Sequence, residues 1–201
     1  MKSALFLKKP ISKKYKAKDL YITFVYICNM NLIIADSSTL ILLAKINLLR
    51  NVYLYFNNII ISETVFKETV ESGKMDNKED SFIIEKEINE GRIIIEKIKD
   101  KKILNEILTG FRCHLGEAEA LTLAINKKSR LFVDDLEAIK ICKIYNIEFI
   151  TALAFLIKLV QDNQIDNELA NIKFNEISKL GYYSKEIIKC TLEEINKKWN
   201  K

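Results

Sequence analysis

The chain has 201 residues, a formal net charge of +5, 49% hydrophobic residues and 29% charged residues. This length and hydrophobic content are sufficient for one domain with a proper core, and together with a single proline they exclude a disordered chain. The chain contains one histidine, His114, which excludes a zinc site built from several histidines and an acid/base pair of two histidines.

The four cysteines, Cys28, Cys113, Cys142 and Cys190, lie far apart, and none belongs to a C-x-x-C pair. This spacing argues against a zinc ribbon or a redox motif. Cysteines scattered among apolar neighbours are usually reduced core residues, so we expect a cytoplasmic protein.

The basic excess lies in the N-terminal segment. Residues 1–29 contain seven lysines and one acid, a net charge of +6, which leaves −1 of the total +5 for residues 30–201. A nucleic-acid partner must therefore be argued from local sites and not from overall charge. The apolar run at residues 20–28 is shorter than the roughly 20 residues of a membrane helix, so no membrane association is expected. The segment 1–29 is either an N-terminal extension or lies upstream of a true start at Met30.

Short apolar runs alternate with helical periods from residue 32 onward. Strands are predicted at residues 32–35, 57–62, 92–95, 130–133 and 147–150. Helical or amphipathic stretches are predicted at residues 39–46, 48–56, 63–73, 82–89, 101–108, 116–126, 136–145 and 152–160, with two more helices from Asp166 onward, split near Gly181. The expected helix caps are Ser37 or Ser38, Ser62, Thr151 and Ser184. Residues 74–80 are expected to form a loop. This alternation predicts an α/β fold with a mainly parallel sheet covered on both faces.

Aspartates follow two of the predicted strands. Asp36 comes directly after the first strand, and Asp134 and Asp135 come directly after the fourth. Ligands of open parallel sheets bind at the carboxyl ends of the strands, so these acids converge if the two strands are neighbours. A lone aspartate after a strand is also often just a helix cap, and this interpretation stays open for each of them.

Three glutamates are expected near the same edge. Glu68 lies in the helix after the second strand, and Glu117 and Glu119 lie at the start of the helix before the fourth. Because residues two apart do not share a helix face, at most one of Glu117 and Glu119 is expected to bind a metal. Crowded carboxylates repel unless a cation neutralises them, and oxygen ligands without histidine or cysteine suit Mg²⁺ or Mn²⁺. Such an ion can activate a water and stabilise charge on a phosphate, so the pattern favours phosphodiester hydrolysis.

Several segments together resemble the PIN-domain family, most closely a prokaryotic branch of nucleic-acid-binding proteins. They are IIADSSTLILLAKI, IISETVFKETVE, LGEAEALTLAINKKSRLFVDDLEA and NIEFITALAFLI, within residues 32–160, and more weakly LGYYSKEIIKCTLEEI. GEAEA and VDD are weak motifs alone, but their order and spacing make the combination specific. The resemblance implies a Rossmann-like five-stranded parallel sheet flanked by helices, Mg²⁺ or Mn²⁺ as cofactor, and single-strand ribonuclease activity.

The resemblance also implies roles for particular residues. The residues implied as catalytic are Asp36, Glu68, Glu117 and Asp135. Those implied to hold metal are Asp36, Glu117, Asp134 and Asp135, with Ser38 supporting the first acid and Glu119 competing with Glu117.

The implied organisation is a PIN-like domain at residues 30–162 and a C-terminal helical extension at residues 163–201 that packs on it. Single-stranded RNA is the implied substrate. Many small PIN proteins, the VapC type among them, are toxins inhibited by a co-encoded antitoxin, and dimers are common. A toxin role, an antitoxin partner and a homodimer are therefore hypotheses here. The alternative is a non-catalytic PIN scaffold that binds RNA or a protein partner.

Other functions fit the sequence less well. The residues after the first strand offer neither the G-x-G-x-x-G of dinucleotide-binding proteins nor a P-loop. Tyr182 and Tyr183 are more typical of core packing or an oligomer contact than of stacking on bases. Lys127, Lys128 and Arg130 lie at the edge opposite the acids and are expected to be solvated.

Overall fold

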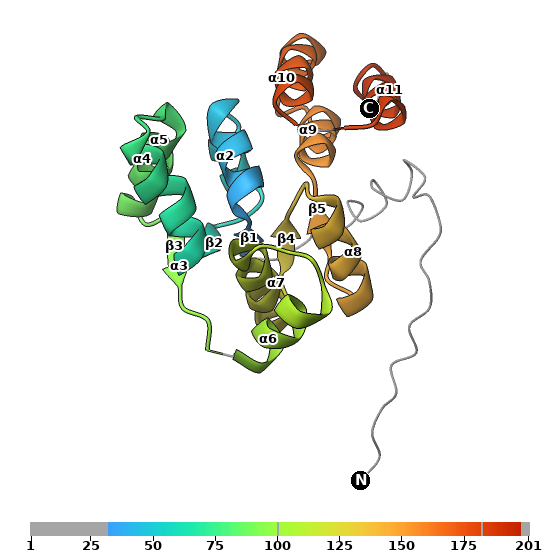
Figure 1. The fold of residues 1–201 in the computed structure, drawn as a ribbon. Helices are drawn as coiled ribbons and strands as arrows, with labels where there is room; N and C mark the ends of the chain where they lie inside the picture. Colours follow the sequence, from blue (N-terminus) through green and yellow to red (C-terminus); the bar gives the residue numbers. More distant parts are fainter. Residues whose placement is uncertain (1–31, 100, 182, 198–201) are drawn as a thin grey trace.

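The computed structural model describes residues 32–99, 101–181 and 183–197 (Figure 1). The predicted N-terminal extension, its Cys28, and Tyr182 lie outside these residues. The strands are β1 (Leu32–Ala35), β2 (Asn58–Ser62), β3 (Ile93–Glu96), β4 (Arg130–Phe132) and β5 (Phe149–Ile150). The helices are α2 (Ser37–Lys45), α3 (Glu63–Phe66), α4 (Ser72–Met75), α5 (Glu79–Asn89), α6 (Lys101–Gly110), α7 (Leu115–Lys127), α8 (Leu136–Tyr145), α9 (Ala152–Gln161), α10 (Asn167–Leu180) and α11 (Lys185–Ile195), with a 3₁₀ helix η2 (Leu49–Leu54) and a π-helical turn η3 (Lys67–Glu71). None of the described helices combines the length and the apolar character needed to cross a membrane.

The five strands form one sheet, in the order β3-β2-β1-β4-β5, and every neighbouring pair is parallel. This confirms the predicted α/β fold with a five-stranded parallel sheet. The strands β1 and β4 are neighbours at the centre, with Ala35 paired to Phe132. The residues that follow these two strands therefore emerge side by side at one edge of the sheet.

Helices cover both faces of the sheet, and a separate apolar core lies on each face. In β1, Ile33 and Ala35 belong to one core and Ile34 to the other, as expected from the alternation of side chains along a strand. Helices α2, α5 and α9 lie on the first side and α6, α7 and α8 on the second (Figure 1). The rings of Phe132 and Phe155 meet edge to face on the first side, with their centroids 5.4 Å apart.

The helices after residue 163 pack on the first core. Phe174 and Ile177 of α10 and Ile195 of α11 are buried in the same cluster as the side chains of α9, and Tyr183 packs against it. Apolar burial thus fixes the position of the junction between α10 and α11. The domain boundary near residue 162 stays a prediction.

Two sequence predictions about local structure were wrong. Residues 74–80 were expected to form a loop, but α4 continues to Met75 and α5 begins at Glu79. Gly73 does not end the helix; a Cβ at this position would lie 2.7 Å from Cβ of Ser81, so the glycine allows α4 and α5 to approach closely. The expected cap of α2 was Ser37 or Ser38, whereas Asp36 is the N-cap. The expected caps Ser62, Thr151 and Ser184 are confirmed.

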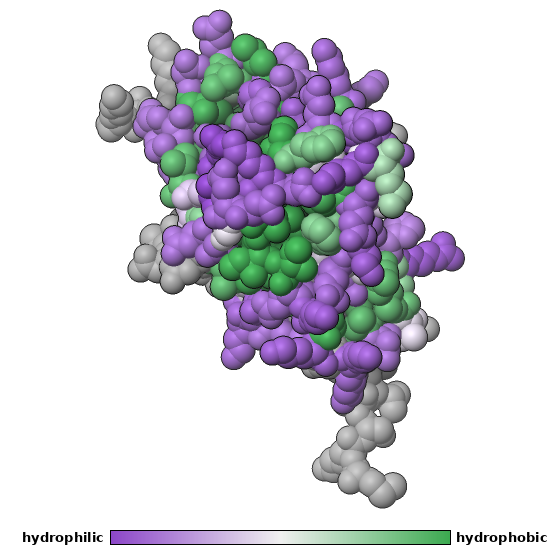
Figure 2. Space-filling model, turned by 90° about the vertical axis from the view of Figure 1, so that its left-hand side faces the viewer, coloured by the Kyte–Doolittle hydropathy of each residue, from purple (hydrophilic) through white to green (hydrophobic). Residues whose placement is uncertain are grey.

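Apolar side chains also remain on the surface near the edge strand β3. Ile94 and Ile95 are 43% and 37% exposed. Figure 2 shows apolar side chains gathered on the face where β3, α4 and α5 lie. Grouped exposed apolar side chains beside an unpaired strand edge are typical of an interaction surface.

Candidate active site

Asp36 is held at the start of α2 by two hydrogen bonds. Its Oδ1 accepts the backbone N–H of Thr39 at 2.8 Å, and its Oδ2 accepts the hydroxyl of Ser38 at 3.1 Å. The side chain caps the helix because an aspartate at the N-cap reaches the N–H three residues on. This capping interaction fixes the carboxylate at the carboxyl end of β1. Only Oδ1 accepts a hydrogen bond from the backbone.

The adjacent aspartates after β4 have different partners. Oδ1 of Asp135 accepts two N–H groups of the first turn of α8, at 2.7 and 2.8 Å. The carboxylate of Asp134 instead accepts the N–H of Ala152 at the start of α9, at 3.1 Å to Oδ2, and the hydroxyl of Tyr183, at 2.9 Å to Oδ1. Asp135 is thus fixed by its own helix, and Asp134 ties β4 to α9 and to the junction after α10.

Glu117 and Glu119 lie on different faces of α7. Oε2 of Glu117 accepts the backbone N–H of His114 at 3.1 Å, at the N-terminus of the helix. Oε2 of Glu119 accepts the backbone N–H of Thr64 at 3.3 Å, in α3. Only Glu117 points to the edge of the sheet where the aspartates lie, whereas Glu119 satisfies a backbone donor of another helix.

Glu68 approaches the same edge from the π-helical turn η3. Its carboxylate accepts a hydrogen bond from the hydroxyl of Ser37. It also lies over Gly116, where an added Cβ would be 2.7 Å from Oε2 of Glu68. The missing side chain at Gly116 therefore makes room for this carboxylate beside the N-terminus of α7.

One cavity of about 430 Å³ is lined by three of these acids, Glu117, Asp134 and Asp135, but not by Asp36, Glu68 or Glu119. Such a volume lies within the range of ligand sites. Its polar lining comes from Ser38, Glu117, Asp134 and Asp135, its apolar wall from Ile41, Leu42, Leu136, Leu180 and the ring of Tyr183, and its one lysine is Lys45. Asp36 is only 1% exposed and meets the cavity through its hydrogen bond to Ser38.

The acids at this edge have raised pKa values, because burial disfavours their ionised form. Burial raises the pKa of Asp36 to about 7; the negative charge of Asp134 adds to the rise, and hydrogen bonds from Thr39 and Ser38 offset it only in part. Burial likewise raises the pKa of Asp134 to about 6. The pKa of Glu117 is raised by burial and by its acidic neighbours. A cation in the cavity would stabilise the ionised carboxylates and so offset the free energy that their burial costs.

The carboxylate oxygens that line the cavity are the kind of ligand that a hard divalent ion prefers. Among the described residues, no hydrogen bond reaches Oδ2 of Asp135 or Oε1 of Glu117, and neither carboxylate forms an ion pair. No three His, Cys, Asp or Glu side chains in the described ranges are spaced to hold one ion between them. Mg²⁺ is commonly bound by one or two carboxylates, its other positions being filled by water and substrate phosphate. Glu117 and Asp135 are the two residues that would hold such an ion.

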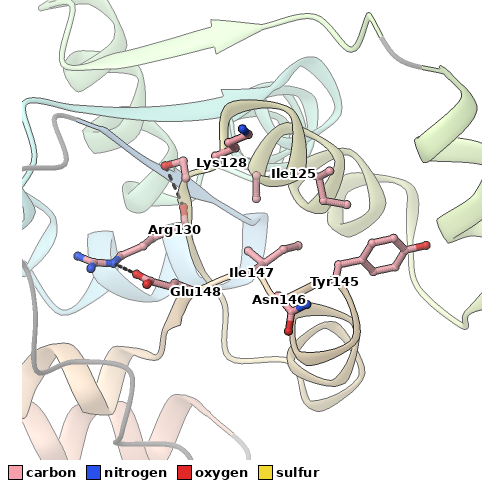
Figure 3. A pocket seen from close by; sticks show the side chains of 9 residues that line it. Ile125, Lys128, Arg130, Tyr145, Asn146, Ile147 and Glu148 are labelled. Carbon is pink, nitrogen blue, oxygen red and sulfur yellow. Dashed lines mark hydrogen bonds and ion pairs between the residues drawn. The ribbon is translucent and has the colours of Figure 1, made fainter. Parts of the chain in front are cut away.

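A second hollow, of about 350 Å³, lies at the opposite edge, where β4 and β5 begin (Figure 3). Arg130 was expected to be solvated, but it is only 5% exposed, and its Nε donates to Oε2 of Glu148 at 2.6 Å. Lys127 is likewise ion-paired, with Glu96 at 2.8 Å. Arg130 pairs with an acid directly before the neighbouring strand β5, and Lys127 pairs with an acid of β3, so these two cations form no basic patch.

The parallel sheet and the acids after its two central strands define an α/β protein with an acidic site suited to phosphate chemistry. The chain belongs to the PIN-domain family: the model of the family DUF3368, described as a PIN domain, matches residues 32–197. PIN domains are commonly nucleases and generally use divalent metal.

A PilT N-terminus domain protein from Sulfolobus solfataricus P2 is similar in structure, with a TM-score of 0.44 and 12% identity, over 76% of this chain and 99% of that chain. This likeness is too weak to support any statement about the site. No curated protein matches the chain.

Sequence reasoning missed two residues with polar groups in the cavity lining, Lys45 and Tyr183. Lys45 follows Ser38 by seven residues, and the face that they share on α2 would have indicated it. Tyr183 was expected to be a packing or oligomer residue. No sequence signal connects it to Asp134, because the contact spans 49 residues and depends on how α10 packs.

Proposed function

We propose that the protein is a metal-dependent ribonuclease that cuts single-stranded RNA. The observation that carries the proposal is the cavity lined jointly by Glu117, Asp134 and Asp135, with Asp36 hydrogen-bonded to Ser38 in its wall. A bound Mg²⁺ or Mn²⁺ would supply an activated water and charge stabilisation at the phosphate.

The chain's own residues would prepare the site for that chemistry. Glu117 and Asp135 present unbonded oxygens from the N-termini of two helices, where the helix dipole also favours anions. Asp36 supplies a third negative charge at a fixed position, and the hydroxyl of Ser38 orients its Oδ2. Glu68, bonded to Ser37, is placed at the side of Glu117.

The rest of the cavity supports a nucleotide as the ligand. An apolar wall separates the acidic end from Lys45, and this lysine forms no ion pair with any residue of the described ranges. A base can pack on the wall while Lys45 binds a neighbouring phosphate. Bases in duplex RNA are stacked and paired, so they cannot pack on the apolar wall of the cavity. We therefore propose single-stranded RNA as the substrate.

A toxin role, a co-encoded antitoxin and a homodimer remain proposals of the same kind. The exposed Ile94 and Ile95 of β3 are the apolar side chains that a partner would cover. Purification of the native complex from its host, with its mass measured by light scattering, tests both partners. A monomer without a bound protein would contradict both the antitoxin and the homodimer.

The test of the activity uses the full chain and one labelled RNA of mixed sequence, either alone or annealed to its complement. We expect cleavage of the single strand in Mn²⁺ and none in EDTA, with the duplex intact. Equal cutting of strand and duplex would contradict the proposed substrate. RNA binding without cutting in Mn²⁺ would favour the non-catalytic scaffold.

Gly116→Ala tests the role of Glu68. The added Cβ should displace the Glu68 carboxylate, which is the end of a flexible side chain, while alanine as the second residue of α7 favours the helix at least as well as glycine. We therefore expect urea denaturation to give an unchanged or higher free energy of unfolding, and we expect cleavage to fall about tenfold, as for other changes in the surroundings of a metal. Gly110→Ala is the control, since a Cβ there meets nothing within 4 Å. Unchanged cleavage by Gly116→Ala would remove Glu68 from the catalytic set.

A further inference from the structure

The junction between α10 and α11 reaches into the acidic site. The hydroxyl of Tyr183 donates to Oδ1 of Asp134 at 2.9 Å, and its ring forms part of the cavity wall with Leu180 and Gly181. This junction lies after the segment that supplies the sheet, so the last helices contribute directly to the site.

Close packing fixes the Tyr183 ring in this position. A Cβ on Gly181 would collide with the ring atoms of Tyr183, so only glycine at position 181 allows the ring to lie where it does. The ring also packs against the first apolar core, as do partly buried side chains of α11 such as Ile187 and Ile188. The hydroxyl therefore reaches Asp134 from a ring that is packed against Gly181 and the first core.

Asp134 depends on this hydroxyl for its orientation. The N–H of Ala152 also donates to both carboxylate oxygens, at 3.1 and 3.3 Å, and the buried side chain of Thr39 interacts with the same carboxylate. The hydroxyl of Tyr183 makes the shortest of these hydrogen bonds, to Oδ1, so together with the N–H of Ala152 it fixes the plane of the carboxylate. The next residue, Asp135, supplies one of the oxygens left open in the cavity.

We propose that Tyr183 is a positioning residue of the acidic site, which holds the Asp134 carboxylate beside Asp135 in the arrangement that binds a divalent cation. The inference rests on the proposed metal-dependent function. Groups that orient the surroundings of a metal commonly change its affinity 10- to 100-fold when they are removed, about the size of effect expected here.

The test compares Tyr183→Phe with Tyr55→Phe in the full chain. Tyr55 is a matched control because its hydroxyl also donates to a carboxylate, Oδ2 of Asp162 at 2.8 Å, but this pair does not line the cavity. Each variant loses one hydroxyl and keeps its ring. The readouts are Mn²⁺ affinity, from the electron paramagnetic resonance signal of the free ion, and the melting temperature in EDTA.

We expect Tyr183→Phe to weaken Mn²⁺ binding about tenfold or more and Tyr55→Phe to change it less than about twofold. Both should lower the melting temperature in EDTA by a few degrees, about the shift that one lost hydrogen bond causes. Gly181→Ala, which keeps the hydroxyl but moves the ring, should weaken Mn²⁺ binding in the same direction. In the Asp134→Asn background, Tyr183→Phe should cause little further loss, because the two residues act through one contact.

Equal Mn²⁺ affinity of Tyr183→Phe and wild type would overturn the proposal and leave Tyr183 with a packing role. Mn²⁺ binding by wild type without any RNA cleavage would contradict the ribonuclease, yet the comparison of variants would still decide the role of Tyr183. Wild type that binds no Mn²⁺ would overturn both.

Discussion

Glu117→Gln should reduce RNA cleavage by about 100-fold or more, whereas Glu119→Gln should leave the rate within about threefold of wild type. The two residues are nearly adjacent on α7, yet only Glu117 lines the cavity with Asp134 and Asp135. Loss of a group that only orients a metal ligand commonly lowers activity 10- to 100-fold. Loss of a carboxylate that would itself hold the ion should therefore lower activity by about 100-fold or more. The measurement is the initial rate of cleavage of a labelled single strand in Mn²⁺.

Stability separates this effect from unfolding. Glutamine at 117 can still accept the N–H of His114, and glutamine at 119 can still accept that of Thr64. Each variant should therefore lose no more than about 1 kcal/mol of unfolding free energy, the difference between a charged and a neutral acceptor. Equal loss of cleavage in both variants would contradict the assignment of Glu117 over Glu119.

Asp36→Asn should stabilise the metal-free protein at pH 8 and have little effect near pH 4. The pKa of Asp36 is raised from 3.8 to about 7 in the folded protein, chiefly by burial. As pH rises through this window the unfolded chain ionises first, so the free energy of unfolding of wild type falls, and the decrease is complete once pH exceeds the folded pKa. Asparagine keeps a cap for α2 without the charge, so its gain at pH 8 should be on the order of 2–4 kcal/mol.

Urea denaturation in EDTA at the two pH values measures this gain. Asp166→Asn is the control: Asp166 caps α10 with the same kind of hydrogen bond, to Leu169 N–H at 2.8 Å, but it is exposed. The control should show no gain at pH 8. A gain of Asp36→Asn that is equal at both pH values would mean that burial of the charge does not set the stability of this site.

The parallel sheet and the place of the aspartates at strand ends could be predicted because both follow from local pattern, whereas the strand order that brings β1 and β4 together could not. Alternation of apolar runs and helical periods indicated the parallel sheet, and Asp36 and Asp134 indicated the strand ends that face one edge. The face of α7 that carries Glu117 follows from helical geometry, which separates residues two apart.

What could not be predicted depends on contacts between distant segments. The hydroxyl of Tyr183 reaches Asp134 only because α10 packs on the first core. Arg130 is buried because β5 places Glu148 beside it, and no local pattern distinguishes such an arginine from a solvated one. The glycine at 73 looked like a helix end, although its role is to admit Ser81.

The most direct test of the active site is cleavage of a mixed pool of single-stranded RNA by wild type and Asp36→Asn, purified in parallel and assayed in Mn²⁺ and in EDTA. We expect cutting by wild type in Mn²⁺ alone, with the Asp36→Asn protein inactive but folded. Equal cutting by both proteins, or cutting that persists in EDTA, would contradict a metal-dependent nuclease site that needs the charge of Asp36.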